Sequence, residues 1–309
     1  PRPTTVLYDP NPEFAAFTLG QVQRWRWTNS AGLPVYGDVV LPVGYRPGRR
    51  YPLIIVQYNS RGFLRGGTGD EYPIHVFANH GFVVLSLNRP TSIGRAKGKV
   101  TGIEIEKVNL KDFAERRSLL SSIEVGVTRL VEQGIVDKQR IGLTGLSDGS
   151  TTLQFALVNG FDVAAAASSS GFWDPGYSQF VGPAAAREFA ASGYPGATQT
   201  MSEFWQSFSI ARNADKIRTP ILLQLADDEY LTSLEGFTTL RDLGRPIDMY
   251  VFAGEHHIKW QPAHRLAIYE RNLDWFEFWL GSPSRRTDPG DGRFALWEQL
   301  RVQARGGKP

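Results

Sequence analysis

The chain has 309 residues, 41% of them hydrophobic, which is enough to bury a sizeable core in one large domain or two small ones. Lys and Arg number 34 and Asp and Glu 31, and residues 282–309, with six basic and three acidic side chains, carry the whole excess of three. The remainder is therefore close to neutral, which gives little reason to expect binding to nucleic acid. The absence of cysteine excludes disulfides, thiol nucleophiles and cysteine-ligated metals.

The first part of the chain predicts a linker, a hairpin and two buried strands. Prolines at positions 1, 3, 10 and 12 indicate that residues 1–20 form an extended linker rather than a packed element. Residues 21–28 and 35–41 alternate polar and apolar side chains on either side of a turn, a pattern typical of a β-hairpin. Residues 51–58 and 81–87 are largely continuous apolar runs, as expected for strands covered on both faces. A mostly parallel sheet with helices on both faces is therefore predicted.

Two helices are predicted from apolar residues that recur at steps of three and four, one between residues 112 and 134 and one that ends at Gly281. The two stripes are Leu120, Ile123, Val127 and Leu130, then Leu266, Tyr269, Leu273, Phe276 and Leu280. Residues 172–215 are rich in Gly, Ala, Ser and aromatic residues and predict a segment inserted beside the functional site. Residues 282–309 predict a polar, peripheral tail in which Phe294, Trp297 and Leu300 form one apolar stripe that could pack on a neighbouring element.

A nucleophile elbow is the most informative feature of the sequence. Residues 140–150 join a short apolar run to Gly145-Leu146-Ser147-Asp148-Gly149 and then to a helix-like segment. In the α/β-hydrolase fold, a serine at such a strand-to-helix turn projects its hydroxyl above the sheet, and the flanking glycines avoid a clash of Cβ atoms. Because Gly-x-Ser-x-Gly also occurs in ordinary strand-to-turn segments, its context decides the interpretation.

The residues after the elbow follow the order nucleophile, acid, histidine that this fold uses. Residues 219–225 predict a buried strand that leads to Asp227-Asp228-Glu229, and residues 246–252 predict a last strand that leads to His256-His257. Ligands bind at the carboxyl edge of the sheet in open α/β folds, and both loops lie at that edge. A catalytic serine, acid and histidine are therefore predicted, with the histidine as general base.

Four segments resemble the prolyl oligopeptidase family. Residues 136–149 are similar to its elbow region, including an Asp-x-x-Arg-Ile lead-in. Residues 219–231 are similar to its Thr-Pro-strand-acid segment, residues 254–257 to its Gly-Glu-x-His loop, and residues 51–58 to its Tyr-Pro-strand-Tyr segment. Together these segments span most of the chain.

The resemblance assigns roles to individual residues. It implies Ser147 as the nucleophile, His257 as the base, and Tyr58 with the backbone amide of Asp148 as donors to the oxyanion. Counted without gaps from Thr219-Pro220, the acid falls on Glu229, whereas Asp227 or Asp228 would require a shortened loop. A glutamate can hold the imidazole in one tautomer as an aspartate does.

The chain also departs from the usual pattern of the family. Ser150 stands where a second glycine is usual, and the variable residue of the elbow is the acid Asp148, which could bind a substrate cation or a local amide. Leu231 occupies a position where some members hold a substrate carbonyl with Arg or Asn, so an extended-peptide clamp is in doubt. With Glu229 and residues 260–276, these departures resemble the lasso peptide isopeptidases, a bacterial branch of the family.

That branch implies a β-propeller before the hydrolase, joined by the linker at residues 1–20, a catalytic domain over 21–281 and the tail at 282–309. It implies hydrolysis of the macrolactam isopeptide bond of a lasso peptide through a Ser147-His257-Glu229 triad and an acyl-enzyme. The alternatives are a conventional oligopeptidase or a dipeptidyl or acylaminoacyl peptidase, an esterase, and, in another class, a non-catalytic binding protein.

The partners expected on this interpretation are a peptide substrate and the propeller. No cofactor or metal is required, because residues 255–257 lack a helical His-x-x-x-His pair. No apolar run approaches the length of a membrane span, so a soluble protein is predicted. The resemblance implies a bacterial protein, and the choice between cytoplasm and periplasm stays open.

Overall fold

A computed structural model of the chain describes residues 8–9, 11–58, 71–281 and 292–305. Within these ranges the strands form one eight-stranded sheet in the order β1-β2-β4-β3-β5-β6-β7-β8. The strands are β1 Val22–Thr28, β2 Pro34–Val40, β3 Tyr51–Tyr58, β4 Val83–Asn88, β5 Val136–Gly145, β6 Ala165–Ser168, β7 Ile221–Ala226 and β8 Ile247–Phe252.

The sheet is antiparallel at one side and parallel over the rest. Strand β1 pairs with β2 as the predicted hairpin, with Val22 opposite Val40, and β2 is antiparallel to β4. Every other pair of neighbouring strands is parallel. Parallel strands bring their carboxyl ends to one edge, so the loops that follow β5, β7 and β8 open on the same side of the molecule.

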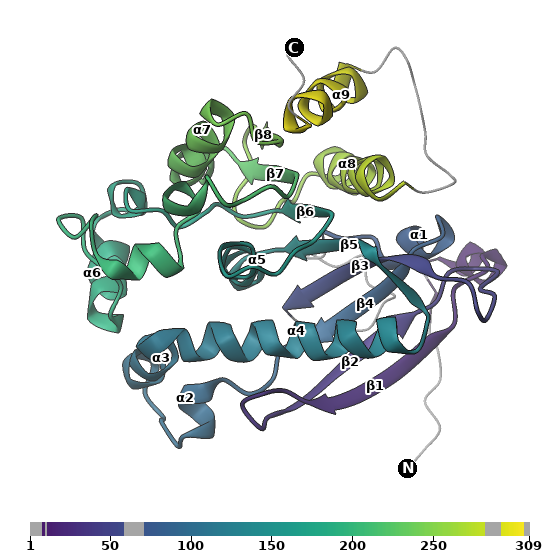
Figure 1. The fold of residues 1–309 in the computed structure, drawn as a ribbon, viewed down its shortest axis with the longest axis horizontal. Coiled ribbons are helices and arrows are strands. Elements are labelled where there is room, and N and C mark those ends of the chain that lie inside the picture. Colours follow the sequence, from purple (N-terminus) through teal and green to yellow (C-terminus); the bar gives the residue numbers. More distant parts are fainter. Residues whose placement is uncertain (1–7, 10, 59–70, 282–291, 306–309) are drawn as a thin grey trace.

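Helices cover both faces of the sheet (Figure 1), as predicted. The helices are α1 Ile74–Asn79, α2 Ile93–Ala96, α3 Gly102–Leu110, α4 Ala114–Glu132, α5 Asp148–Val158, α6 Pro183–Ser192, α7 Leu234–Asp242, α8 Pro262–Leu280 and α9 Gly292–Ala304. Alternate side chains of β3 enter opposite cores: Leu53 and Ile55 pack in the core under α4 and α5, and Ile54 packs in the core under α1, α8 and α9. This alternation explains why β3 is apolar throughout its length.

The two predicted apolar stripes form the inner faces of α4 and α8. All four apolar residues of the first stripe are buried, and Gly134 beyond the end of α4 has φ 72°. In α8, Leu273, Phe276 and Leu280 are buried, but Tyr269 is only partly buried and Leu266 is 58% exposed, while Ile268, outside the predicted stripe, is buried. Gly281 ends the helix with φ 69°, a left-handed conformation that glycine adopts without a Cβ clash.

Two segments differ from the prediction. The described part of residues 1–20 is not wholly extended: it contains the short 3-10 helix η1, Pro12–Ala16, in which no residue is buried. Residues 292–304 of the predicted peripheral tail form α9, and Trp297 in this helix is fully buried, edge-on to Trp275 at 5.1 Å between ring centroids. The apolar stripe of α9 therefore completes the core next to α8.

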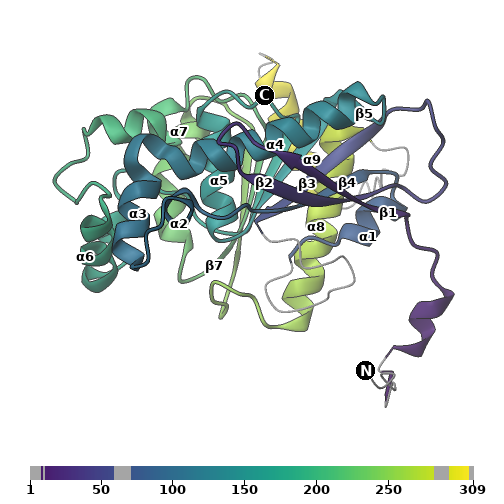
Figure 2. The ribbon, with the colours of Figure 1, turned by 90° about the horizontal axis from the view of Figure 1, so that it is seen from below.

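The inserted segment lies at the carboxyl end of the sheet, as predicted. It comprises the 3-10 helices η3 Tyr177–Gln179, η4 Glu203–Ser207 and η5 Ala211–Asn213 together with α6. Helix α6 contacts α3, and these helices gather with α2 at one end of the molecule (Figure 2). In Figure 1 the arrowheads of β3 and β4 point toward that end.

Candidate active site

Ser147 lies on a strained turn between β5 and α5. Its φ of 56° and ψ of −128° are uncommon for a residue with a side chain. A Cβ on Gly145 would lie 2.7 Å from the Cα of Ser150, and one on Gly149 would lie 3.2 Å from the Cβ of Tyr58. Backbone packed against the elbow therefore excludes a side chain at Gly145, and the end of β3 leaves little room for one at Gly149.

Hydrogen bonds with the side chains of Ser170 and Gln57 hold this turn. The backbone N–H of Ser147 donates to Ser170 Oγ at 2.9 Å. The side-chain amide of Gln57 donates to the carbonyl oxygens of Thr144 at 2.9 Å and Gly149 at 2.7 Å. The backbone N–H of Ser147 is therefore already used. The next N–H along the chain is that of Asp148, which has no acceptor within the helix because Asp148 is the first residue of α5.

Each of the three consecutive acids after β7 has a different partner. Asp227 accepts a hydrogen bond from the backbone N–H of Gly254 at 2.6 Å, and Asp228 contacts His256 Nδ1 at 2.7 Å. Glu229 contacts Nδ1 of His257 through Oε1. The structure thus pairs His257 with Glu229, the acid that the gapless count selected.

The hydrogen bond with Glu229 raises the pKa of His257 above its ordinary value, although partial burial of the ring opposes this. The acid is the more enclosed partner, since the side chain of Glu229 is 21% exposed and that of His257 43%. Nδ1 is occupied by the carboxylate, so Nε2 is the nitrogen left for proton transfer.

Ser147, Glu229 and His257 line one cavity of about 660 Å³, which we call the elbow cavity. Asp148 and Asp228 line it too, and the aromatic side of its wall comes from the inserted segment. The aromatic residues there are Phe172, Trp173, Tyr177, Phe180, Phe189 and Tyr194. Trp173 stands edge-on to Phe189 at 4.6 Å between ring centroids, so the wall is a packed aromatic cluster.

The carboxylate of Asp148 is held by two arginines rather than by a local amide. Arg116 contacts one of its oxygens, and Arg89 donates to the other at 2.9 Å. Burial opposes ionisation of Asp148, but the two guanidinium groups outweigh it and lower the pKa of this carboxyl. With its charge already matched, Asp148 is not available as the binding site for a substrate cation that the sequence left open.

Tyr58 ends β3 with φ 118°. Its carbonyl oxygen accepts a hydrogen bond from the backbone N–H of Arg89 at 3.1 Å, and the guanidinium carbon of Arg89 lies 5.6 Å from the centroid of its ring. Arg89 therefore contacts both predicted oxyanion residues, Tyr58 and Asp148. Tyr58 is not among the residues that line the elbow cavity, and neither is Leu231, which is 38% exposed.

The sequence did not predict a buried ion pair between Lys259 and Glu71. Lys259 lies in the loop between β8 and α8, residues 253–261, which also carries His257 and which we call the histidine loop. Lys259, fully buried, donates to the carbonyl oxygen of Ser169 at 2.7 Å and lies 3.4 Å from Glu71 Oε1. Burial raises the pKa of Glu71, and Lys259 counteracts that effect. The only sequence signal was a lysine two residues after His257. Since Ser169 adjoins Ser170, which bonds Ser147, the pair ties the histidine loop to the elbow.

Among the residues that the structure describes, no group of three or more His, Cys, Asp or Glu side chains is placed to hold a metal ion. No helix within the described ranges is both long and apolar enough to cross a membrane.

A mostly parallel sheet with helices on both faces and a serine on a glycine-flanked strand-to-helix turn defines the α/β-hydrolase fold. The chain belongs to the prolyl oligopeptidase family, which matches residues 118–283. It is 42% identical over 297 residues to the lasso peptide isopeptidase AtxE2 of Asticcacaulis excentricus, a match that covers 96% of this chain and 43% of that protein. The chain thus spans less than half the length of this relative.

Solved structures agree with this similarity. AtxE2 without ligand and a serine-to-alanine variant with Astexin3-dC4 bound both superpose with a TM-score of 0.90, at 42% and 41% identity, over 96% of this chain and 46% of theirs. The acylaminoacyl peptidase of Pyrococcus horikoshii, 19% identical, shares the fold with a TM-score of 0.66 over 94% of this chain and 46% of its own. The predicted resemblance to lasso peptide isopeptidases is confirmed.

Proposed function

We propose that this chain is the hydrolase portion of a lasso peptide isopeptidase that opens a macrolactam through a Ser147-His257-Glu229 triad. The observation that carries the proposal is the Glu229–His257 contact in the cavity that Ser147 lines. The similarity to AtxE2 over 96% of the chain supports the substrate class. The predicted β-propeller before the catalytic portion stays a prediction, as does the choice between cytoplasm and periplasm.

In the proposed mechanism, the Oγ of Ser147 attacks the carbonyl carbon of the isopeptide amide while Nε2 of His257 takes its proton. The tetrahedral intermediate carries its negative charge on the former carbonyl oxygen, toward the N–H of Asp148. The family resemblance adds the hydroxyl of Tyr58 as a second donor; Tyr58 lies next to the elbow, beside Gly149, but outside the lining of the elbow cavity. Collapse of the intermediate breaks the C–N bond, and the amine leaves with the proton from His257. Water, deprotonated by His257, then cleaves the acyl-enzyme ester and releases the side-chain carboxylic acid.

Arg89 and Arg116 support the oxyanion donors in this scheme. They hold the side chain of Asp148, the residue that supplies the backbone donor, at the start of α5. Arg89 also packs over Tyr58, the second donor. Hydrogen-bond donors that are fixed before the reaction stabilise the developing negative charge without having to reorganise. This electrostatic stabilisation is usually the largest single contribution to catalysis.

The test uses the full-length protein and its Ser147→Ala variant. We expect a fluorophosphonate probe to label only the wild-type protein, and turnover to fall by about a million-fold when the nucleophile is removed. Wild-type protein that stays unlabelled would instead favour a non-catalytic binding protein. An unchanged thermal midpoint of the variant serves as the control for folding.

Substrate class is tested separately with a threaded lasso peptide and the same peptide unthreaded by heat. A threaded peptide presents its scissile amide in a fixed geometry, so an enzyme without an extended-peptide clamp gains most from it. We expect the threaded form to be cleaved faster. Faster cleavage of linear dipeptidyl or acylaminoacyl substrates than of the lasso peptide would assign the chain to a conventional oligopeptidase.

A further inference from the structure

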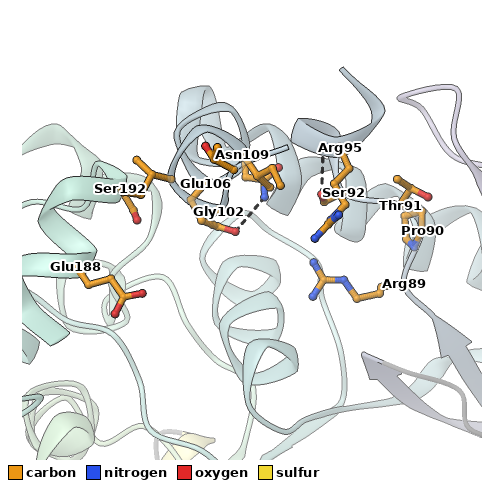
Figure 3. Close-up of a pocket in the computed structure, with 13 residues that line it drawn as sticks. Arg89, Pro90, Thr91, Ser92, Arg95, Gly102, Glu106, Asn109, Glu188 and Ser192 are labelled. Carbon is orange, nitrogen blue, oxygen red and sulfur yellow. Dashed lines mark hydrogen bonds between the residues drawn. The ribbon is translucent and has the colours of Figure 1, made fainter. Parts of the chain in front are cut away.

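A second cavity of about 920 Å³ lies beside the elbow cavity, and we call it the α2–α3 cavity. It is enclosed by the loop after β4, by α2 and α3, and by α6 on the far side (Figure 3). Glu106, Glu188 and Ser192 line both cavities. The two cavities therefore adjoin one another along α3 and α6.

The charged residues that line the α2–α3 cavity are two arginines, Arg89 and Arg95, and two carboxylates, Glu106 and Glu188. In Figure 3, Arg89 and Arg95 point their guanidinium groups toward one another from the side of β4 and α2, and Glu188 extends from α6 across the cavity. Two guanidinium groups that face each other repel, and a carboxylate between or beside them removes that repulsion. Carboxylates already contact Arg89, so Arg95 is the cation on this wall that a negatively charged ligand could meet.

The charges behind this wall show which arginine is available. Arg89 contacts Glu115 and Asp148, and Arg116 contacts Asp148, so two guanidinium groups face two carboxylates and the set sums to zero. Arg95 is exposed and forms no ion pair with any residue that the structure describes. Its charge is the unmatched one on this wall of the cavity.

We propose that Arg95 binds a free carboxylate of the peptide substrate in the α2–α3 cavity while the scissile amide lies at Ser147. This inference rests on the proposed function and assigns a further subsite to it. A guanidinium group binds a carboxylate through two parallel hydrogen bonds, which lysine cannot reproduce. The carboxylate comes either from the C-terminus of the peptide or from an acidic side chain outside the ring.

The first experiment measures binding, so that it does not depend on turnover. Astexin3-dC4 as the free acid, the peptide bound to AtxE2, is titrated into full-length protein carrying Ser147→Ala, alone and with Arg95→Gln, Arg95→Lys or Arg187→Gln. Arg187 is an exposed arginine of α6 that does not line either cavity, so its variant carries the same change of charge. We expect about tenfold weaker binding for Arg95→Gln, partial recovery for Arg95→Lys, and no change for Arg187→Gln.

The second experiment identifies the carboxylate. Binding of a C-terminally amidated peptide and of a peptide with its side-chain carboxyls amidated is compared in the Arg95 and Arg95→Gln backgrounds. The source is the group whose amidation weakens binding when Arg95 is present and has no effect when it is absent. Equal binding by the Arg95→Gln and Arg187→Gln variants, or no effect of either amidation, would overturn the subsite.

The proposed function and the subsite fail in distinguishable ways. If the Ser147→Ala protein shows the Arg95 dependence while the wild-type protein leaves the ring intact, the subsite stands and the isopeptidase function is wrong. If the wild-type protein opens the ring and Arg95→Gln behaves as Arg187→Gln does, the function stands and the subsite is wrong.

Discussion

Replacing Glu229 with glutamine tests the acid that contacts His257. The change keeps the length of the side chain and removes its negative charge. In the wild-type protein that charge stabilises the imidazolium of His257, which forms when Ser147 loses its proton. Two unit charges about 4 Å apart interact by about 4 kcal/mol at an effective dielectric constant of roughly 20, which corresponds to about three powers of ten in rate. Because the side chain of His257 is 43% exposed, solvent screening reduces this contribution.

The glutamine introduces a second defect. If its NH₂ group faces His257, the imidazole carries its proton on Nε2 and cannot accept the proton of Ser147. If its oxygen faces His257 instead, the NH₂ group takes the place of Glu229 Oε2, a buried atom without a hydrogen-bond partner in the described part of the chain. In a serine protease triad the corresponding acid-to-amide change costs about 10⁴ in kcat, and we expect a loss of roughly 10³ to 10⁴ here.

Asp228→Asn is the matched control, because Asp228 also contacts a histidine Nδ1. The side chains of Asp228 and His256 are 49% and 78% exposed, so their pair contributes little and activity should stay within about threefold of wild type. Both variants are assayed as full-length protein by chromatographic separation of threaded substrate from ring-opened product. Comparable losses in the two variants would refute the assignment of Glu229.

The pH profile gives a second, independent measurement on the same variant. His257 must be neutral to act as a base, so kcat/KM rises as the pH rises through its pKa. The hydrogen bond with Glu229 raises that pKa, and Glu229→Gln removes the cause. The acid limb of the profile should therefore move to lower pH. An acid limb that does not move would show that Glu229 does not set the pKa of the base.

Three other predictions follow from the same geometry. His257→Ala should be inactive and His256→Ala much milder, because His256 contacts only the exposed Asp228; equal losses of kcat/KM would leave the base unassigned. Gly145→Ala should lower the free energy of unfolding by at least about 1–3 kcal/mol, since its Cβ meets backbone at 2.7 Å, whereas Gly102→Ala, with nothing within 4 Å, should change it by less than about 1 kcal/mol. Lys259→Met should cost about 3–5 kcal/mol by leaving Glu71 buried without its counter-charge, and adding Glu71→Gln should recover part of that loss; denaturant unfolding that shows no recovery would argue against the pair.

Much of the fold was determined by local sequence patterns. The apolar run of β3 is buried on both faces, and the stripe on α4 faces the core, because burial of apolar surface acts on each element according to its own period. The elbow was equally local. A Cβ on Gly145 would meet the backbone of Gly149 and Ser150, so the requirement for a small residue there is visible in the chain itself. The resemblance that these patterns supported led to the family that the comparisons show.

The contacts between distant residues were decided by the tertiary structure. Strands β7 and β8 are parallel with Ala226 opposite Phe252, and this register sets the two following loops side by side and so determines which acid meets which histidine. Asp148 finds Arg89 and Arg116 from positions 59 and 32 residues away, and no local pattern specifies such a pair. Charge matching depends on distance in space, whereas periodicity depends on distance along the chain. For this reason the sequence alone determined the sheet and the elbow, and only the tertiary structure decided which charges are matched and that Arg95 is left without a partner among the described residues.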